Sequence, residues 1–309
     1  MSAHLLKTFA CVLAVVACTQ SERPTEAIEA GKGLPEVYTV NYPLAYFAER
    51  IAGESVTVVF PAPPDVDPAF WSPSVETIAD YQRADLVLLN GAGYAAWIQR
   101  ATLSQSRLVD TSAALADRLI PVDDTVTHSH GPGGDHSHQG AAFTTWLDMV
   151  FAVGQARAVF DALVRLRPDN ESVFRERLSD LEKDLGGLDK RLQDVAERIG
   201  DRPLVFSHPV YQYLGRGYGL NGRSVHWEPH ELPGNDQWRE LTELLTAHAV
   251  AWMIWEDEPL PDTVHQLEGL GIKSLVYRPC GNQPTEGNFV SVMLDNVAAL
   301  ERAFPAPAL

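Results

Sequence analysis

A regularly spaced apolar stripe between residues 170 and 200 constrains the fold more than any other feature of this sequence. Its members alternate in steps of four and three residues, and they are Phe174, Leu178, Leu181, Leu185, Leu188, Leu192, Val195 and Ile199. This spacing places them on one face of an α-helix. Asp169 or Asn170 is positioned to cap its start and Gly200 to end it. At about 1.5 Å per residue, such a helix is roughly 40 Å long.

Two arrangements use a stripe of this kind. A coiled-coil dimer needs strict 3-4 spacing, and a single helix that packs along two lobes of one chain needs the same pattern. Gly186 and Gly187 interrupt the polar face. We therefore favour the intramolecular helix and expect a monomer.

Short apolar runs alternate with amphipathic stretches on both sides of this helix. The runs that predict strands are Val37–Tyr42, Val56–Phe60, Leu86–Leu89, Leu108–Val109, Leu204–Ser207, Ala251–Trp255 and Lys273–Tyr277. The stretches that predict helices are Pro43–Ala52, Ser74–Ala84, Tyr94–Thr102, Trp238–His248, Asp262–Leu270 and Phe289–Phe304. Strands separated by helices of this length form βαβ units around a parallel sheet. The sequence predicts an α/β protein with two lobes, each with a parallel sheet and flanking helices, bridged by one long rigid helix.

Length and charge bound the organisation and the partners. The 309 residues suit two domains. We expect an N-terminal α/β lobe over residues 34–168, a linking helix over residues 169–200 and a C-terminal α/β lobe over residues 201–309. The formal charge of −17 argues against nucleic acid as a partner, because a phosphate-binding surface needs a basic patch.

The N-terminus has the pattern of an export signal. Lys7 precedes an apolar run, Phe9 to Ala17, which is too short to span a bilayer and ends at Cys18. This resembles a bacterial lipoprotein signal, in which the cysteine is lipidated and becomes the new N-terminus. We expect a signal peptide over residues 1–17, a membrane anchor at Cys18 and a flexible tether over residues 18–33. The alternative is an ordinary signal peptide that contains a cysteine.

The anchor would place the protein in a bacterial cell envelope, in the periplasm or another extracytoplasmic space. Cys11 would leave with the signal and Cys18 would carry lipid, so only Cys280 would remain. A single thiol forms no internal disulfide. We therefore expect the exported protein to fold through core packing alone.

A histidine-rich tract interrupts the first lobe. It contains two His-x-His pairs, His128 with His130 and His136 with His138, separated by the turn-forming run Gly-Pro-Gly-Gly and Asp135. Such a run excludes a helix or a strand of a packed core. Neutral imidazole is a common ligand for zinc-class metals. We expect this loop, residues 125–140, to contact metal weakly; the alternative is a solvated linker that happens to be rich in histidine.

An ordered set of motifs then points to a family. The motifs are Asp65-Val-Asp-Pro68, Ala84-Asp-Leu-Val-Leu-Leu-Asn-Gly91, Trp146-Leu-Asp148, Ser207-His208 followed by Tyr211 and Tyr213, and Trp255-Glu256. Together with the His-rich loop and the long helix, they resemble the zinc/manganese-type substrate-binding proteins of bacterial ABC importers. The resemblance runs from about Val37 to the C-terminus. It implies two α/β lobes joined by a rigid helix, with a metal cleft between them, and a membrane permease as the partner.

The resemblance also implies a ligand set, from which this sequence departs in the first lobe. Family members hold the metal with a histidine after the first-lobe Asp-Pro and another two residues before Trp-Leu-Asp. Ala69 and Thr144 stand at these two places, so the chain is an atypical member. The second-lobe positions are kept, as His208 and Glu256. Arg278 stands where the family commonly has an acidic residue.

Two physical arguments support the second-lobe residues independently. His208 and Glu256 each follow a predicted strand, and ligands of open α/β sheets lie outside the carboxyl ends of strands. Imidazole and carboxylate are both zinc ligands. A histidine favours zinc over manganese, which prefers harder oxygen donors. The alternatives are a core histidine for His208 and a member of an acidic cluster for Glu256.

Further ligands are expected from the segment between these strands. Glu228 and His230 lie in the run His226-Trp-Glu-Pro-His-Glu231, which is otherwise a loop leading into a helix. We expect Asp148 to act as a helix cap or as a group that orients a ligand. Trp71, Trp227 and Trp255 flank candidate segments, so they are either cleft walls or core.

Three functions fit these features. The leading interpretation is a receptor that captures Zn²⁺ and delivers it to an ABC-type importer, with Mn²⁺ as the less favoured cargo. The alternatives are a zinc-buffering or metallochaperone lipoprotein and an adhesion-type lipoprotein on the same scaffold. An enzyme is not expected, because the sequence lacks a G-x-S-x-G elbow, an H-E-x-x-H helix and a P-loop.

Overall fold

The first half of the chain forms a parallel four-stranded sheet in the order β2-β1-β3-β4. The computed structural model describes residues 33–122, 127–129, 135–137 and 140–307. The elements of this first lobe are β1 (Glu36–Thr39), α1 (Tyr42–Ala52), β2 (Thr57–Val59), α2 (Val75–Arg83), β3 (Leu86–Leu89) and β4 (Leu108–Asp110). The predicted strands therefore form, and they pair as a parallel sheet.

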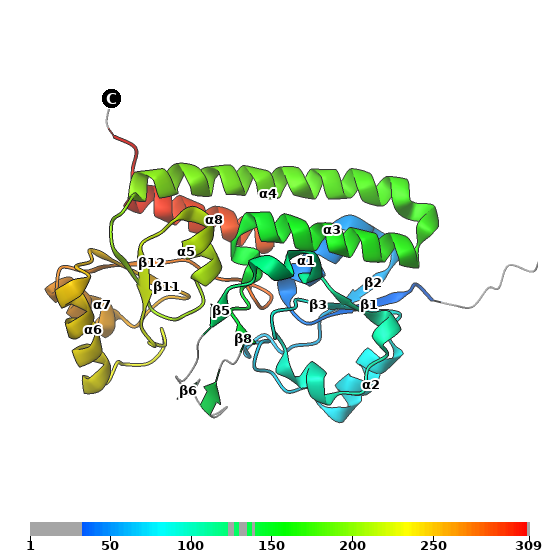
Figure 1. The fold of residues 1–309 in the computed structure, drawn as a ribbon, viewed down its shortest axis with the longest axis horizontal. Coiled ribbons are helices and arrows are strands. Elements are labelled where there is room, and N and C mark those ends of the chain that lie inside the picture. The colour runs from blue at the N-terminus through cyan, green and yellow to red at the C-terminus, as the bar shows by residue number, and fades with distance from the viewer. Residues whose placement is uncertain (1–32, 123–126, 130–134, 138–139, 308–309) are drawn as a thin grey trace, which may run out of the picture. The chain divides into compact units, whose positions relative to one another are not determined.

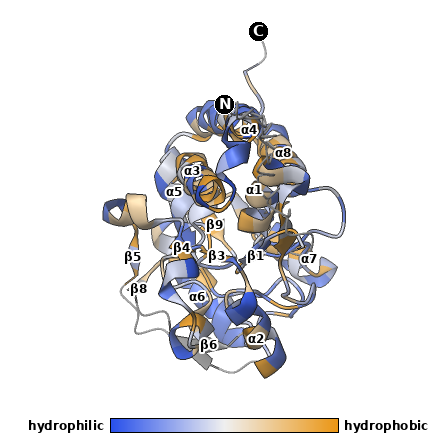
Figure 2. Ribbon diagram, turned by 90° about the vertical axis from the view of Figure 1, so that its right-hand side faces the viewer, coloured by the Kyte–Doolittle hydropathy of each residue, from blue (hydrophilic) through white to orange (hydrophobic). Residues whose placement is uncertain are grey.

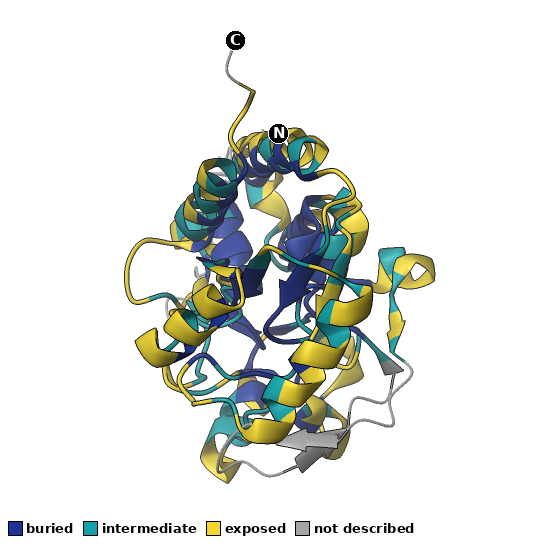
Figure 3. Cartoon of the chain, turned by 90° about the vertical axis from the view of Figure 1, so that its left-hand side faces the viewer, coloured by how far each residue is buried: buried dark blue, intermediate teal, exposed yellow. Residues whose placement is uncertain are grey.

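The second half repeats this arrangement with the order β10-β9-β11-β12, again parallel throughout. Its elements are β9 (Leu204–Phe206), α5 (Gln212–Tyr218), β10 (Gly222–Ser224), α6 (Asn235–Ala247), β11 (Trp252–Trp255), α7 (Pro261–Gly269), β12 (Lys273–Val276) and α8 (Phe289–Ala303). Central strands are buried, whereas the helices that flank them keep one face exposed (Figure 3). Each lobe thus has its own sheet, as the sequence predicts.

One long helix, α4 (Glu171–Ile199), runs along both lobes (Figure 1). All eight residues of the predicted stripe are buried. The helix packs against α1, α3 and α8, of which α3 and α8 are visibly more hydrophobic than α4 itself (Figure 2). Its polar face, with Gly186 and Gly187, is exposed. The intramolecular interpretation of the stripe is therefore correct.

The two ends of α4 differ from each other in how they are capped. Gly200 ends the helix at a φ of 56°, a left-handed value that glycine adopts without strain. At the start, Asn170 occupies the cap position, but its side chain makes no capping hydrogen bond. It donates instead to the Ser55 hydroxyl at 3.2 Å. The predicted C-terminal stop is confirmed, and Asn170 holds the predicted N-cap position without a side-chain capping hydrogen bond.

Two helical segments differ from the prediction: one was not predicted, and one is shorter and of another helix type. The helix α3 (Met149–Leu166) packs against α1 and α4, and Asp148 caps it by accepting a hydrogen bond from the Val150 N–H at 2.9 Å. The expected helix over Tyr94–Thr102 is only a 3₁₀ segment, Ala96–Arg100. Ala95, which precedes it, has a left-handed φ of 57° that interrupts regular helix.

The histidine-rich tract lies outside both main sheets. β5 (Pro121–Val122) pairs with β8 (Gly140–Ala141), and between them β6 (Thr127–Ser129) pairs antiparallel with β7 (Asp135–Ser137). His128 and His136 are Cα partners in this hairpin. His130, His138 and Cys18 lie outside the described residues. In the part of the chain that the structure describes, no helix has the length and apolar character needed to cross a bilayer.

Candidate metal-binding cleft

A cavity of about 560 Å³ lies between the two lobes, and residues from both lobes line it. The second lobe contributes loops that follow β9, β10, β11 and β12, and these loops begin at the carboxyl ends of parallel strands. Ligands of α/β sheets bind at such ends. All four cleft candidates from the sequence line this cavity: His208, Glu228, His230 and Glu256.

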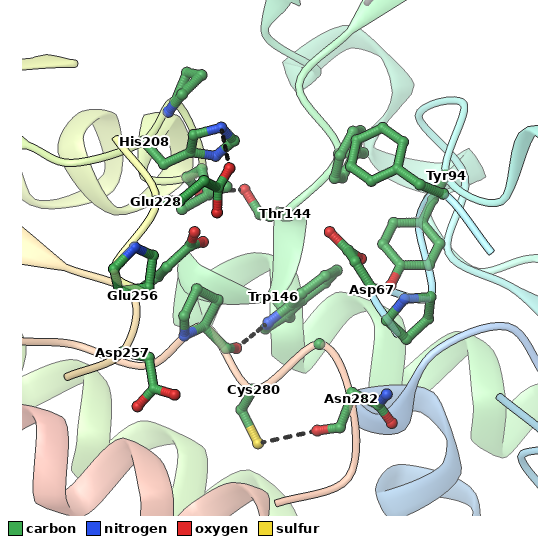
Figure 4. Close-up of a pocket in the computed structure, with 18 of the residues that line it drawn as sticks. Asp67, Tyr94, Thr144, Trp146, His208, Glu228, Glu256, Asp257, Cys280 and Asn282 are labelled. Carbon is green, nitrogen blue, oxygen red and sulfur yellow. Dashed lines mark hydrogen bonds and ion pairs between the residues drawn. The ribbon is translucent and has the colours of Figure 1, made fainter. Parts of the chain in front are cut away.

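His208 and Glu228 form the most closely associated pair of candidates. His208 comes two residues after β9 and is 4% exposed. Its Nε2 atom lies 3.9 Å from Oε1 of Glu228 (Figure 4). Zinc sits about 2.0–2.2 Å from imidazole nitrogen and carboxylate oxygen, so one ion can reach both atoms at this separation.

Backbone hydrogen bonds fix the segment that carries Glu228. The Trp227 N–H donates to the Ser207 carbonyl at 2.7 Å, and the Leu260 N–H donates to the Pro229 carbonyl at 3.0 Å. Because Ser207 immediately precedes His208, the first bond holds the two candidate ligands in register. The loop therefore holds Glu228 beside His208, and its role as a metal ligand stays a prediction.

Glu256 and His230 occupy different parts of the cavity wall. Glu256 directly follows β11, and its carboxylate points into the same space as Glu228 (Figure 4). The His230 side chain is 68% exposed, and its Nε2 atom lies 3.4 Å from Oδ2 of Asp257. We interpret His230 as a residue of the cavity rim.

The two first-lobe positions that lack the family's histidines, Thr144 and Ala69, lie in different environments. Thr144 lines the cavity, and its hydroxyl donates to the Val210 carbonyl of the other lobe at 2.5 Å. Ala69 is 6% exposed and belongs to the apolar core. The first lobe instead presents Asp67, whose carboxylate faces the second-lobe carboxylates across the cavity (Figure 4). Its place in the Asp-Val-Asp-Pro motif was the signal for this residue, which the sequence analysis did not select.

Aromatic rings form most of the first-lobe wall. Phe70 packs edge-to-face on Phe143 with centroids 6.0 Å apart, and Tyr94 packs on Phe143 and Trp146 at 5.3 and 5.7 Å. Burial raises the pKa of Tyr94 well above its ordinary value, and nearby Asp67 adds to the effect. Trp227 and Trp255 are fully buried in the second-lobe core, and Trp71 does not line the cavity. The tryptophan of the cleft wall is therefore Trp146.

Polar contacts join the lobes around the cavity. Asn282 Nδ2 donates to the carbonyls of Pro63 and Val66 at 2.7 and 2.8 Å. Trp146 Nε1 donates to the Pro279 carbonyl at 2.7 Å. The bonds to Val66 and Pro279 are partly buried, and the bond to Pro63 is exposed. The cleft is thus bounded by segments that are held to each other across the two lobes.

Arg278 and Cys280 of the second lobe differ in their relation to the cavity. The Nη2 atom of Arg278 lies 3.0 Å from Oδ1 of Asp257 and 3.5 Å from Oε1 of Glu258, and Arg278 does not line the cavity. Cys280 does line it, and burial raises the pKa of its thiol to about 12. Within the described ranges, no three or more His, Cys, Asp or Glu side chains are grouped around a shared metal position.

Comparison with known proteins identifies the family. A family model described as "Zinc-uptake complex component A periplasmic" matches residues 37–303. The chain belongs to this family. The resemblance inferred from the motifs is therefore confirmed, and the family is one of uptake components rather than of enzymes.

The proteins that resemble this chain are named for more than one metal. The chain is 25% identical over 310 residues to the zinc-binding lipoprotein AdcA of Streptococcus pneumoniae, covering 96% of this chain and 60% of AdcA. It therefore spans three-fifths of that relative's length. It is 26% identical over 295 residues to the manganese-binding lipoprotein MntA of Halalkalibacterium halodurans, covering 93% of each. A crystal structure of the metal-dependent lipoprotein YcdH from Bacillus subtilis shares the fold, with a TM-score of 0.73, 22% identity, and coverage of 87% of this chain and 98% of YcdH.

Proposed function

We propose that this protein is an extracytoplasmic receptor that captures Zn²⁺ in the cleft between its lobes and delivers it to the permease of an ABC importer. One observation carries the proposal: His208, Glu228 and Glu256 converge on one interlobe cavity at the carboxyl ends of the strands. Membership in the zinc-uptake family supports the transport role.

The choice of zinc over manganese depends on the imidazole. His208 offers an imidazole nitrogen within the cavity. Imidazole is a good ligand for zinc, whereas manganese prefers sites made of oxygen donors. The carboxylates of Glu228 and Glu256 suit both metals. Because one relative is a manganese-binding lipoprotein, the metal must be tested directly.

Anchoring and the histidine loop belong to the same proposal. Cys18 attaches the protein to the membrane through lipid, and residues 18–33 allow the lobes to reach the permease.

The histidine loop provides weaker, additional zinc sites through His128, His130, His136 and His138. These sites are weaker because histidines on a glycine-rich tether lose chain entropy on ordering. Deleting residues 128–138 is expected to remove the weaker zinc equivalents in calorimetry and to leave a tighter one.

The deciding experiment is zinc titration of a matched pair of histidine variants. His208→Ala is expected to weaken zinc binding by at least tenfold, equivalent to about 1.4 kcal/mol, because it removes the imidazole from the cleft. His265→Ala is the control, since His265 is exposed on α7 of the same lobe and does not line the cavity. Equal affinities for the two variants would contradict a zinc site at His208.

A transport assay distinguishes uptake from zinc buffering. Deletion of the gene is expected to slow accumulation of radioactive zinc at low external zinc, and re-expression of the wild-type protein is expected to restore it. The His208→Ala protein would not restore it. Normal accumulation in the deletion strain would favour the buffering interpretation instead.

A further inference from the structure

The two walls of the cavity have different chemistry. The second lobe supplies Glu228, Glu231, Glu256 and Asp257 together with His208, and the first lobe supplies Asp67 beside four aromatic rings. No lysine or arginine lines the cavity within the described ranges. The cavity therefore suits an occupant that has an apolar or ring-bearing side and carries no net negative charge.

The size of the cavity suits a molecule rather than a single ion. Its volume of about 560 Å³ lies in the range typical of small-molecule sites, roughly 300–1,000 Å³. A metal ion contacts its ligands at about 2 Å, and it leaves most of such a volume to other atoms. The space next to the aromatic wall is available to an organic group.

Tyr94 supplies a polar group on the aromatic side. Its residue is 7% exposed, and its hydroxyl is buried with no hydrogen-bond partner among the described residues. The hydroxyl lies beside Gly281, which also lines the cavity. A buried hydroxyl without a partner is unfavourable, so an occupant that offers an acceptor, such as a carboxylate oxygen, gains a hydrogen bond there.

We propose that the cleft takes zinc as a complex, without net negative charge, with a small organic chelator that has nitrogen donors, such as an amino acid with an imidazole ring. The proposal rests on the proposed zinc function. His208 and Glu228, whose Nε2 and Oε1 atoms lie 3.9 Å apart, contact the metal from the second lobe. The chelator supplies the donors that Ala69 and Thr144 do not, packs its ring on Phe70 and Phe143, and accepts a hydrogen bond from Tyr94.

Equilibrium dialysis with three probes tests this assignment. The probes are zinc chloride alone, zinc with two equivalents of radioactive L-histidine, and zinc with citrate, whose complex is anionic. We expect zinc with histidine to bind at least tenfold more tightly than zinc alone, with histidine retained in proportion to bound zinc. Zinc citrate is expected to bind more weakly than zinc histidine, because the cavity repels negative charge.

A matched pair of phenylalanine variants locates the chelator. Phe70 and Phe60 are both half-buried in the first lobe, but only Phe70 lines the cavity. Phe70→Ala is expected to weaken binding of zinc histidine by about tenfold, equivalent to about 1.4 kcal/mol, because it removes a ring on which the chelator packs. It is expected to leave the binding of zinc alone unchanged. Phe60→Ala is expected to change neither. Tyr94→Phe, which keeps the ring, provides a second variant if Phe70→Ala does not fold, and it is expected to weaken only zinc histidine.

The outcomes separate this inference from the proposed function. If zinc binds while histidine stays in solution, or if zinc citrate binds as tightly as zinc histidine, the chelate assignment is overturned and the zinc receptor stands. If Phe70→Ala and Tyr94→Phe both bind zinc histidine as the wild type does, the chelate does not occupy the aromatic side. If neither zinc alone nor zinc histidine binds, the proposed zinc function fails together with this inference.

Discussion

The two lobes share an α/β architecture but build their sides of the cleft differently. The second lobe presents polar side chains on short loops after its strands, with His208 and Glu256 each within two residues of a strand end. The first lobe presents packed rings, of which Trp146 is 1% exposed. The same fold can therefore keep a ligand-bearing wall on one side and replace it with a packing wall on the other.

The difference is visible in what each wall contributes to stability. Rings on the first-lobe wall contact one another and hydrogen-bond to the second lobe through Trp146. The second-lobe wall carries several carboxylates, and no lysine or arginine lines the cavity among the described residues. Substitution of the buried ring Trp146 should thus affect mainly folding, and substitutions on the second wall should affect mainly metal binding.

The largest expected effect tests the packing role of the first wall. Trp146→Ala is expected to lower the free energy of unfolding by about 3–5 kcal/mol, the usual cost of removing a buried aromatic side chain. Trp146→Phe should cost less, because it keeps ring packing and loses the hydrogen bond to the Pro279 carbonyl. Urea denaturation followed by circular dichroism measures both. Wild-type stability in Trp146→Ala would show that the first wall is not a packing wall.

A smaller effect is expected from giving the first wall a ligand. Thr144 lines the cavity, so Thr144→His should place an imidazole there and tighten zinc binding by about tenfold, or 1.4 kcal/mol. The change also removes the hydrogen bond to Val210, at a cost of about 1 kcal/mol in stability. Zinc titration against the wild type checks the gain; an affinity no tighter than that of the wild type would mean that the lobes do not meet at coordinating distance.

Ala69→His is not an equivalent change. Ala69 is buried in the apolar core and does not line the cavity, so a histidine there would overfill the core. We expect Ala69→His to be less stable than the wild type, without a gain in zinc affinity. The two vacated positions of the first lobe therefore differ in what they can regain.

Repeating patterns made the fold predictable from the sequence. The stripe in α4 and the apolar runs of the strands recur at fixed spacing, so they identified the helix, both parallel sheets and the bridging arrangement. The helix α3 was missed, although its buried residues include Phe151, Ala152, Val159 and Phe160 at helical spacing. It directly follows the Trp-Leu-Asp motif, whose Asp148 is its N-cap.

The site was less predictable, because it depends on which side chains of different loops face the same space. The cavity-lining positions of His208, Glu228, His230 and Glu256 followed from strand ends and from the family resemblance, and their role as ligands stays a prediction. Asp67 was not predicted, because the family resemblance marks position 69, two residues further on, as the ligand position. The tryptophans show the same limit: Trp227 and Trp255 lie next to site residues in sequence, yet their side chains point into the core.

The smallest expected effect concerns Asp148, which lies where the first wall meets the second lobe. Its carboxylate caps α3 and lies 3.9 Å from Arg118. Burial raises the pKa of Asp148 above its ordinary value of 3.8, although Arg118 and Arg216 oppose the shift. The ionised form is thus disfavoured in the folded protein relative to the unfolded chain. This group favours folding most below pH 3.8, and the contribution is lost as the pH rises through the raised value.

Two substitutions separate the cap from the charge. Asp148→Asn keeps a good N-cap and cannot ionise, so its stability at pH 7 should equal or exceed that of the wild type, and its stability should depend less on pH just above pH 3.8. Asp148→Ala removes the cap and should cost about 1 kcal/mol. Urea denaturation between pH 4 and pH 7 measures both variants. A loss of stability in Asp148→Asn that grows with pH would show that ionised Asp148 stabilises the folded protein through Arg118. Burial would then not be the dominant influence on the pKa of this carboxyl group.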